Sequence, residues 1–379
     1  MMEALLLGRS LLTLGGESTG AMADRIGNLS AVTFAGDGAL WLASDERQDA
    51  RNRLIRLAPD EAGNFTAPQS FAIGDFVRML DGNDERESEA DIEGLACEDD
   101  ALWLTGSHAT KRQRPDAGSL ADVHRHLHEV ERDANRYLLA RIPLHHGIPA
   151  HATASVGASL RETAAARLAD GTGGNVLIEA LREDKHLGLF LRPGGDGRGT
   201  ETLPLPGKDN GLDIEGLAVF GRRLFLGLRG PVLRGWAILL QIEPAEQGRG
   251  LLTLGNLGHK RTYCKHFLDL GGLGIRDLAR DEGDLLILAG PTMTYAAPQR
   301  LYRLHEAVSL ANNSANTCDD GQLARVCDLP FSAQGARAEG ITPLLWRGRR
   351  AVMVVYDQPA GPLGAPPAAV LADVFALDG

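Results

Sequence analysis

Short apolar runs separated by turn residues make up most of this chain, and one local pattern of them returns five times. A polar start leads into an apolar strand, a turn follows, and a second apolar strand comes back. The clearest copies read DIEGL at 91–95 and at 213–217, with second strands at 102–104 and 224–226. Weaker copies begin at Asn28, Gly274 and Ala338. Apolar runs bounded in this way are typical of β-hairpins, so the sequence predicts a repeat protein.

The position of the glutamate in DIEGL is filled by different residue types in the five copies. The equivalent residues are Ser30, Glu93, Glu215, Arg276 and Glu339. They recur at intervals of about 60 residues, except that the interval after Glu93 is about twice as long. That long interval holds either one repeat with an insertion or two repeats.

Two further apolar runs of strand length follow most hairpins. The third runs are 54–57, 137–140, 237–240, 301–304 and 370–374, and the fourth runs are 70–73, 189–191, 266–270 and 325–329. The last repeat lacks a fourth run, which the apolar residues 4–14 can supply. Four-stranded units closed by pairing the two ends of the chain describe an all-β fold, the β-propeller. Closure hides the sheet edges that an open array would expose.

Residues 108–187 depart from the strand pattern. Segments 117–135 and 160–187 carry apolar residues at helical spacing. We therefore predict a single propeller domain over residues 1–379, with five four-stranded blades and a helical elaboration at about 108–187 in the second blade. The alternative is six blades, in which residues 178–181 are a decayed copy of the motif.

Composition and charge narrow the classes of partner. The 379 residues carry a net charge of −11, which argues against a nucleic-acid partner. No apolar stretch reaches the roughly 18 residues of a membrane span, and Glu3 and Arg9 make the N-terminal segment a poor secretory signal. The four cysteines lack the spacing of a metal site or a disulfide framework. We expect a cytoplasmic protein with free cysteines and no membrane partner.

Carboxylates collect at one end of the predicted channel. The start of the first strand and the end of the second lie at the same end of an antiparallel hairpin. Glu93, Glu215 and Glu339 are therefore expected to converge, and converging carboxylates are costly unless a cation or protons neutralise them. We predict that these three residues hold a divalent cation, and oxygen ligands favour Ca²⁺ or Mg²⁺.

Basic and hydroxyl side chains are expected around the same end. Arg229 and His108 are the predicted catalytic residues, which would steady developing negative charge. The predicted substrate-binding residues are Arg276, Arg234, Lys111, Arg112, Tyr356 and Asp357. A guanidinium fork suits a carboxylate or phosphate, so the expected ligand is a small polar or anionic molecule. Ion pairs between blades and solvated loops are the structural alternatives for these residues.

Two functions from different classes are compatible with these residues. The sequence holds no nucleophile elbow, P-loop or dinucleotide fingerprint. The first function is a metal-dependent hydrolase of small polar or anionic esters, lactones or phosphoesters. The second is a non-catalytic propeller that binds a protein partner or a small ligand, and fold alone does not choose between them.

Three stretches also carry a resemblance to a known family. Residues 208–218, residues 227–237, and Gly106-Ser107-His108 with Lys111 and Arg112 resemble the bacterial family catalogued as domain of unknown function 3616. That family has no established activity to carry over. The glutamate–glycine start of the first strand is more distantly similar to esterase-like phytases and to gluconolactonase-type lactonases, which are propellers. The likeness to the lactonases implies a metal over the channel and matches only the three glutamates.

Overall fold

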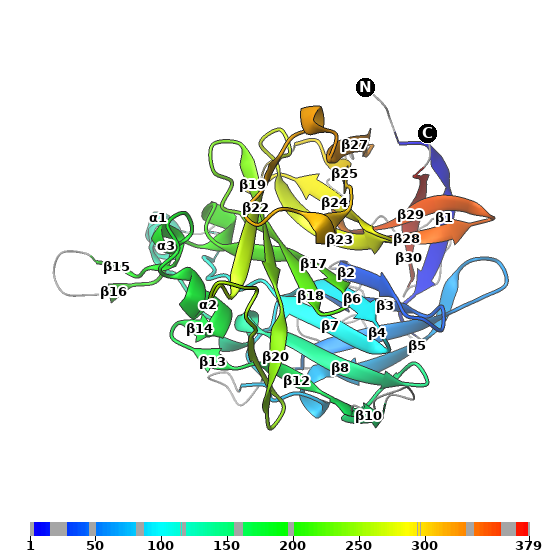
Figure 1. Cartoon of the computed structure of the whole chain (residues 1–379), viewed down its shortest axis with the longest axis horizontal. Helices are drawn as coiled ribbons and strands as arrows, with labels where there is room; N and C mark the ends of the chain where they lie inside the picture. The colour runs from blue at the N-terminus through cyan, green and yellow to red at the C-terminus, as the bar shows by residue number, and fades with distance from the viewer. Residues whose placement is uncertain are drawn as a thin grey trace.

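The repeated hairpins form antiparallel meanders in the computed structural model of the chain (Figure 1). The structure describes residues 4–15, 29–44, 51–80, 87–113, 115, 119–154, 162–195, 201–293, 295, 297–330, 337–357 and 369–377. Strands account for most of the regular structure in these residues, so the predicted all-β class is confirmed.

The meanders are named here units 1 to 5. Unit 1 comprises β2 (Leu29–Phe34), β3 (Leu40–Ser44), β4 (Arg53–Pro59) and β5 (Phe65–Ala72). Unit 2 comprises β6 (Ile92–Glu98), β7 (Ala101–Gly106), β8 (Leu139–His145) and β12 (Ala166–Leu168). Unit 3 comprises β17 (Asp213–Phe220), β18 (Arg223–Gly230), β19 (Trp236–Ile242) and β22 (Tyr263–Asp269). Unit 4 comprises β23 (Gly274–Asp281), β24 (Asp284–Gly290), β25 (Arg300–Leu304) and β27 (Leu323–Asp328). Unit 5 comprises β28 (Arg337–Trp346), β29 (Arg349–Asp357), β30 (Ala369–Ala376) and β1 (Leu6–Thr13).

The first strand of each unit, called here its inner strand, lies against the inner strands of two other units. β2 contacts β6 and β28, β6 contacts β17, and β17 contacts β23, which in turn contacts β28. Each inner strand also stands at one end of its hydrogen-bonded strand order. The inner strands therefore surround a common axis, with one edge of each turned away from the rest of its sheet.

Apolar side chains fill the space between successive units. β17 is buried over its whole length, as expected for a strand that is covered on both faces. Separate hydrophobic clusters join unit 1 to unit 2, unit 2 to unit 3, unit 3 to unit 4 and unit 4 to unit 5. Another cluster, which includes Val32, Met353 and Val370, joins unit 5 back to unit 1. Packing is therefore continuous from the last unit to the first.

The N-terminal strand completes unit 5, as the sequence predicts. β1 pairs antiparallel with β30, with Leu12 opposite Val370. It also touches unit 1, where Leu12 pairs in parallel with Phe65 of β5. The two ends of the chain are thus held in one sheet.

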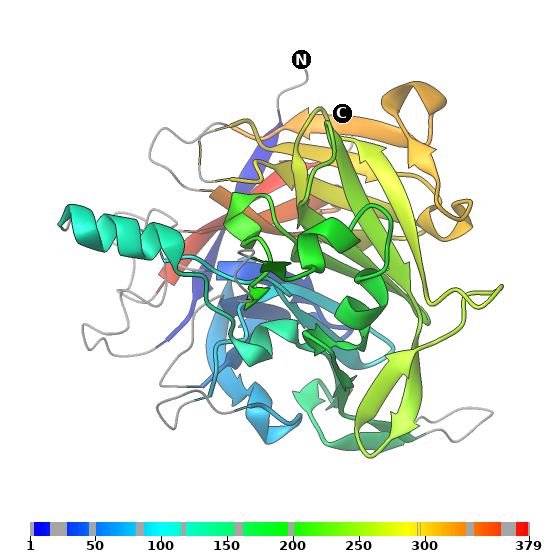
Figure 2. The same ribbon diagram turned by 90° about the vertical axis from the view of Figure 1, so that its left-hand side faces the viewer.

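Two of the helices predicted in the elaboration are confirmed, and one is wrong. Helix α1 (Leu120–His128) lies inside the predicted segment 117–135, and a Ser119–Asp122 capping box starts it. No residue of α1 is buried, and Figure 2 shows it projecting from the body. Helix α2 (Val176–Leu181) is also as predicted. The helix predicted for residues 160–168 is wrong, because β11 (Glu162–Ala164) and β12 occupy its described part.

The sequence pattern predicts the fourth strand of unit 2 at residues 189–191, and this prediction is wrong. Residues 189–191 lie in helix α3 (Gly188–Leu191), and β12 takes the fourth position instead. β12 is stabilised by parallel pairing with β21 (Leu251–Leu254), which follows unit 3's third strand. Pairing of such distant segments leaves no local signal in the sequence.

The copy of the motif that the six-blade alternative required is a helix. Asn175 caps α2 by accepting hydrogen bonds from Leu177 and Ile178, and the apolar side of α2 packs in the cluster between units 2 and 3. Residues 178–181 therefore form no inner strand. In the described part of the chain, no helix combines the length and hydropathy that a membrane crossing requires.

Candidate functional site

A β-bulge marks each of the equivalent positions identified in the sequence. In unit 3, Ile214 pairs with Leu228 and Gly216 with Gly227, so the register shifts at Glu215. The same shift occurs at Ser30, Glu93, Arg276 and Glu339. A bulge re-aims the side chain of its extra residue and is frequent beside functional sites. The chain thus uses the same β-bulge in five units to present side chains of three kinds, which are serine, glutamate and arginine.

The glycine after the bulge lets neighbouring inner strands approach closely. A Cβ atom on Gly216 would lie 2.6 Å from Cγ of Leu278, and one on Gly94 would lie 2.8 Å from Cβ of Leu217. Both distances are too short for a real contact. The glutamate–glycine pair therefore combines a directed carboxylate with close packing of the next unit.

The bulge residues of units 3, 4 and 5 are joined by ion pairs. Glu215 Oε1 lies 2.7 Å from Arg229 Nη1, and its Oε2 lies 3.0 Å from Arg276 Nε. Arg276 also pairs with Glu339, and Arg229 pairs with Asp213. All five side chains are buried. Two arginines thus alternate with three carboxylates across three units.

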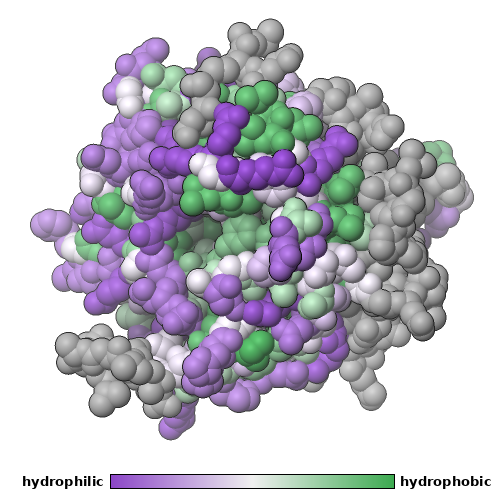
Figure 3. All heavy atoms as spheres, turned by 90° about the vertical axis from the view of Figure 1, so that its right-hand side faces the viewer, coloured by the Kyte–Doolittle hydropathy of each residue, from purple (hydrophilic) through white to green (hydrophobic). Residues whose placement is uncertain are grey.

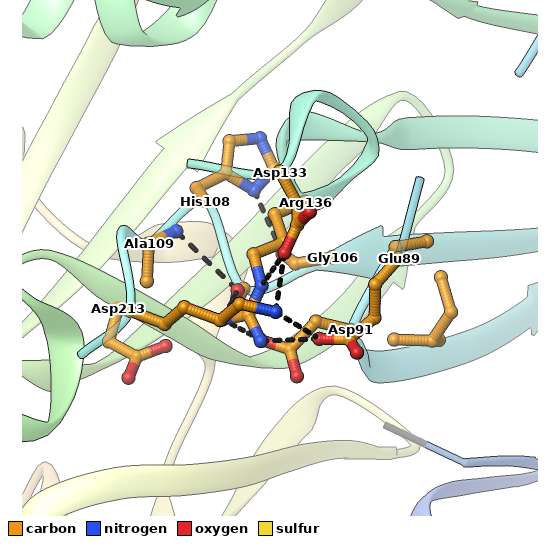
Figure 4. Close-up of polar contacts among 12 residues, drawn as sticks. Glu89, Asp91, Gly106, His108, Ala109, Asp133, Arg136 and Asp213 are labelled. Carbon is orange, nitrogen blue, oxygen red and sulfur yellow. Dashed lines mark hydrogen bonds and ion pairs between the residues drawn. The ribbon is translucent and has the colours of Figure 1, made fainter. Parts of the chain in front are cut away.

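A second group of charges extends this network into unit 2 (Figure 4). Arg136 Nη1 lies 2.6 Å from Asp91, and its Nη2 lies 2.6 Å from Glu89. Lys111 Nζ lies 2.7 Å from Asp133 and 3.6 Å from Glu89. These contacts hold the loops of unit 2 beside the start of its inner strand. Sequence reasoning missed Arg136, which lies outside the repeated motif.

Burial changes the acidity of the carboxyl groups in this layer. It raises the pKa of Glu215 to about 8, although Arg229 and Arg276 both oppose that change. It also raises the pKa of Asp213, against the charge of Arg229, and that of Asp277 well above the ordinary value. These groups therefore favour added positive charge, whether as a proton or as a cation.

The pKa of Arg276 shows that the three glutamates converge on its side chain. Burial alone would lower its pKa, but Glu215, Glu339 and Glu93 together raise it above the ordinary value. Glu93 and Asp357 are the half-buried members of this layer. Burial raises the pKa of Asp357, and the charge of Glu339 adds to that effect.

The predicted divalent cation does not fit this arrangement. In the described ranges, no group of three or more His, Cys, Asp or Glu side chains could hold a metal. Arg276 stands between Glu215 and Glu339 and supplies the positive charge that an ion was expected to bring.

His108 uses both ring nitrogens within the protein. Its Nδ1 lies 2.8 Å from the carbonyl oxygen of Gly106, and its Nε2 lies 2.8 Å from the side-chain amide of Asn175. Burial lowers its pKa to about 4, so the ring is neutral. Nδ1–H then donates to the carbonyl, and Nε2 accepts from the amide. These contacts tie unit 2 to the cap of α2, and the catalytic role of His108 stays a prediction.

The other predicted binding residues lie in separate surroundings. Arg112 Nε lies 2.9 Å from Asp209, and Arg234 is exposed in a turn. The Tyr356 hydroxyl donates to Asp373 of β30, 3.0 Å away, and burial raises the pKa of Tyr356. Of the predicted substrate-binding residues, Arg276 and Asp357 thus belong to the charged layer at the inner-strand starts, and Lys111 belongs to its extension in unit 2.

Comparisons with known proteins place the chain in a family without giving it an activity. A family model described as "Protein of unknown function (DUF3616)" matches residues 28–373. A comparison with curated proteins gives no match.

The solved structures that match this chain are remote in sequence. The tail fiber of Staphylococcus aureus phage P68 is 10% identical, with a TM-score of 0.35, over 100% of this chain and 53% of that chain. This chain thus spans about half of the tail fiber. An α-L-arabinofuranosidase from Lactobacillus brevis is 10% identical, with a TM-score of 0.38, over 92% of this chain and 89% of that chain. A glucose dehydrogenase is 14% identical, with a TM-score of 0.33, over 92% of this chain and 82% of that chain.

Proposed function

The chain belongs to this family of proteins of unknown function, and from that premise we propose that it is a five-bladed, non-catalytic propeller that binds a small cationic ligand. The site is the charged layer where the inner strands begin. Units 1 to 5 are the blades in this proposal. Contacts between successive inner strands and the hydrophobic cluster that joins unit 5 to unit 1 support that count.

The observation that carries the proposal is the excess of buried carboxylates over arginines in this layer. Among the described residues of this layer, the buried acids are Asp91, Asp213, Glu215, Asp277 and Glu339, and the buried arginines are Arg136, Arg229 and Arg276. Each arginine already contacts at least one of these acids. An incoming anion would have to displace a carboxylate. A cation can instead take the place of the protons that the raised pKa values of Glu215 and Asp277 favour.

The ligand would meet Glu93 and Asp357 first. Both side chains are half-buried, whereas Glu215 lies deeper and is only 1% exposed. An ammonium or guanidinium group on the ligand can donate hydrogen bonds to carboxylates, and such charge-assisted bonds are stronger than neutral ones. This reverses the anionic ligand that the sequence suggested.

Thermal unfolding with small probes tests this proposal. Methylguanidinium should raise the melting temperature in a saturable way, and acetate and inorganic phosphate should not, because binding to the native state alone stabilises it. Glu339→Gln should weaken the response at least tenfold. Glu61→Gln, in an exposed turn, is the matched control and should respond like the parent protein.

Two outcomes would count against the proposal. Saturable stabilisation by phosphate and not by methylguanidinium would restore the anionic ligand. One Ca²⁺ or Mg²⁺ per chain, lost in Glu215→Gln, would restore the metal-dependent hydrolase, which otherwise stays a prediction from the sequence.

A further inference from the structure

The end of the channel opposite the charged layer holds a cavity. Its volume is about 230 Å³, and every unit contributes to its lining. Counted from the bulge, the lining residues form three successive rings. The first ring is Val32, Leu95, Leu217, Leu278 and Ile341; the second is Thr33, Ala96, Ala218, Ala279 and Thr342; the third is Phe34, Cys97, Val219, Arg280 and Pro343. Glu98 completes the lining.

The first ring gives the cavity an apolar base. Branched apolar side chains form the first ring, and small side chains of the second ring leave room above it. Figure 3 looks onto this side of the molecule and shows a recess with hydrophobic residues at its base and hydrophilic ones around it. Small-molecule sites typically combine apolar side chains with a small number of placed polar groups, and the walls above this apolar base are largely polar.

Hydrogen-bonding groups on the walls come mainly from the backbone. Each inner strand is the last strand of its hydrogen-bonded order on the channel side. An edge strand presents N–H and C=O groups that no neighbouring strand pairs. The hydroxyls of Thr33 and Thr342 add two side-chain groups.

The charged groups of the lining satisfy each other. Arg280 pairs with Glu98, which also accepts a hydrogen bond from the Gly221 backbone N–H at 2.9 Å. The Arg280 guanidinium lies 5.0 Å from the centre of the Phe220 ring. A charged ligand would therefore meet no unmatched opposite charge here, in contrast to the layer at the other end.

We propose that this cavity is a second binding site, for an uncharged molecule with a compact apolar body and one hydrogen-bonding group. The size supports this class, because an apolar cavity of about 150 Å³ can hold benzene. The site requires neither the charged layer nor its cationic ligand, so the two proposals can fail independently.

Ligand-observed NMR and calorimetry with three probes of similar shape test this site. Benzamide should bind with a dissociation constant of about 1 mM, as expected for so small a ligand. Benzoate and benzylammonium should bind at least tenfold more weakly, because their charges would lose water without gaining a partner.

Two variants locate the binding. Ala279→Leu fills the second ring and should abolish benzamide binding. Thr342→Val keeps the shape of the side chain but removes a hydroxyl, and it should weaken benzamide binding about threefold. The control is Thr66→Val, which lies in β5 outside the cavity and should bind benzamide like the parent protein. The melting temperature of each variant reports whether it folds, and Thr342→Val serves if Ala279→Leu does not.

Absence of benzamide binding at about 20 mM, well above the expected dissociation constant, would overturn the proposal. Equal binding of benzoate would overturn the uncharged class. Unchanged benzamide binding in both cavity variants would place the probe elsewhere and would also overturn it.

Discussion

At the scale of single residues, a few contacts provide partners for buried charged and polar side chains. Arg276 is the clearest case, because it joins Glu215 of unit 3 to Glu339 of unit 5 from a bulge in unit 4. His108, whose ring is neutral, plays a similar linking role, because its two ring nitrogens bind Gly106 and Asn175. Both side chains link segments that lie far apart in the sequence.

Removing the cation from the charged layer should be strongly destabilising. Arg276→Met leaves Glu215 and Glu339 buried without the guanidinium between them, and breaking such a pair costs about 3–5 kcal/mol. Urea unfolding at neutral pH measures this loss. Adding Glu215→Gln to Arg276→Met should recover part of the stability. A loss below about 1 kcal/mol in the single variant would show that the pairs are loose and solvated.

Acid should destabilise the fold through its buried histidines. Burial lowers the pKa of His108 and of His266 to about 4 each. An unfolded histidine titrates near 6.5, so the unfolded chain takes up protons first as the pH falls. Stability should therefore fall between pH 6.5 and pH 4, by about 3 kcal/mol for His108.

A histidine substitution isolates that contribution. Urea unfolding of His108→Gln should show a smaller loss of stability between pH 7 and pH 4.5 than the parent protein. His145→Gln, at an exposed position, should keep the parent's pH dependence. An identical pH dependence in His108→Gln would mean that His108 is protonated readily in the folded protein.

At the scale of elements, the hairpin with its bulge is the unit that the chain repeats. The bulge directs a side chain toward the axis, and the glycine that follows brings the next inner strand close. The bulge is common to all five units, where its residue is serine, glutamate or arginine, whereas the glycine follows only the three glutamates.

The close approach at the glycine can be tested with one methyl group. Gly216→Ala would place its Cβ 2.6 Å from Cγ of Leu278, and such overpacking costs about 1–3 kcal/mol. Gly283→Ala is the control, because a Cβ there would meet nothing within 4 Å. Thermal unfolding should separate the two variants. Equal melting temperatures would mean that the inner strands have room to move apart.

Local signals in the sequence account for the hairpins and for the closing strand. Alternation and turn residues act within a few positions, so the inner strands and β1 could be predicted. The pairing of β12 with β21 joins residues 167 and 251 and leaves no such signal. In the charged layer the shared position of three glutamates was readable, whereas the insertion of Arg276 between two of them depends on packing between units.

At the scale of the whole molecule, the N-terminal strand holds the first and last units together. β1 pairs along β30 and touches β5. Deleting residues 1–16 should lower the melting temperature strongly and promote aggregation, because it leaves β30 as an exposed edge. Replacing α1 by a short linker is the control, because none of its residues is buried. Similar melting temperatures for the two deletions would contradict closure of the ring by β1.

The central claim is that the charged layer accepts a cation at the end of a five-bladed channel. A crystal structure grown with both methylguanidinium and inorganic phosphate tests it most directly. The account predicts methylguanidinium against Glu93, Glu339 or Asp357, with Arg276 still between Glu215 and Glu339. Phosphate bound to Arg229 and Arg276, or a metal ion shared by the three glutamates, would contradict it.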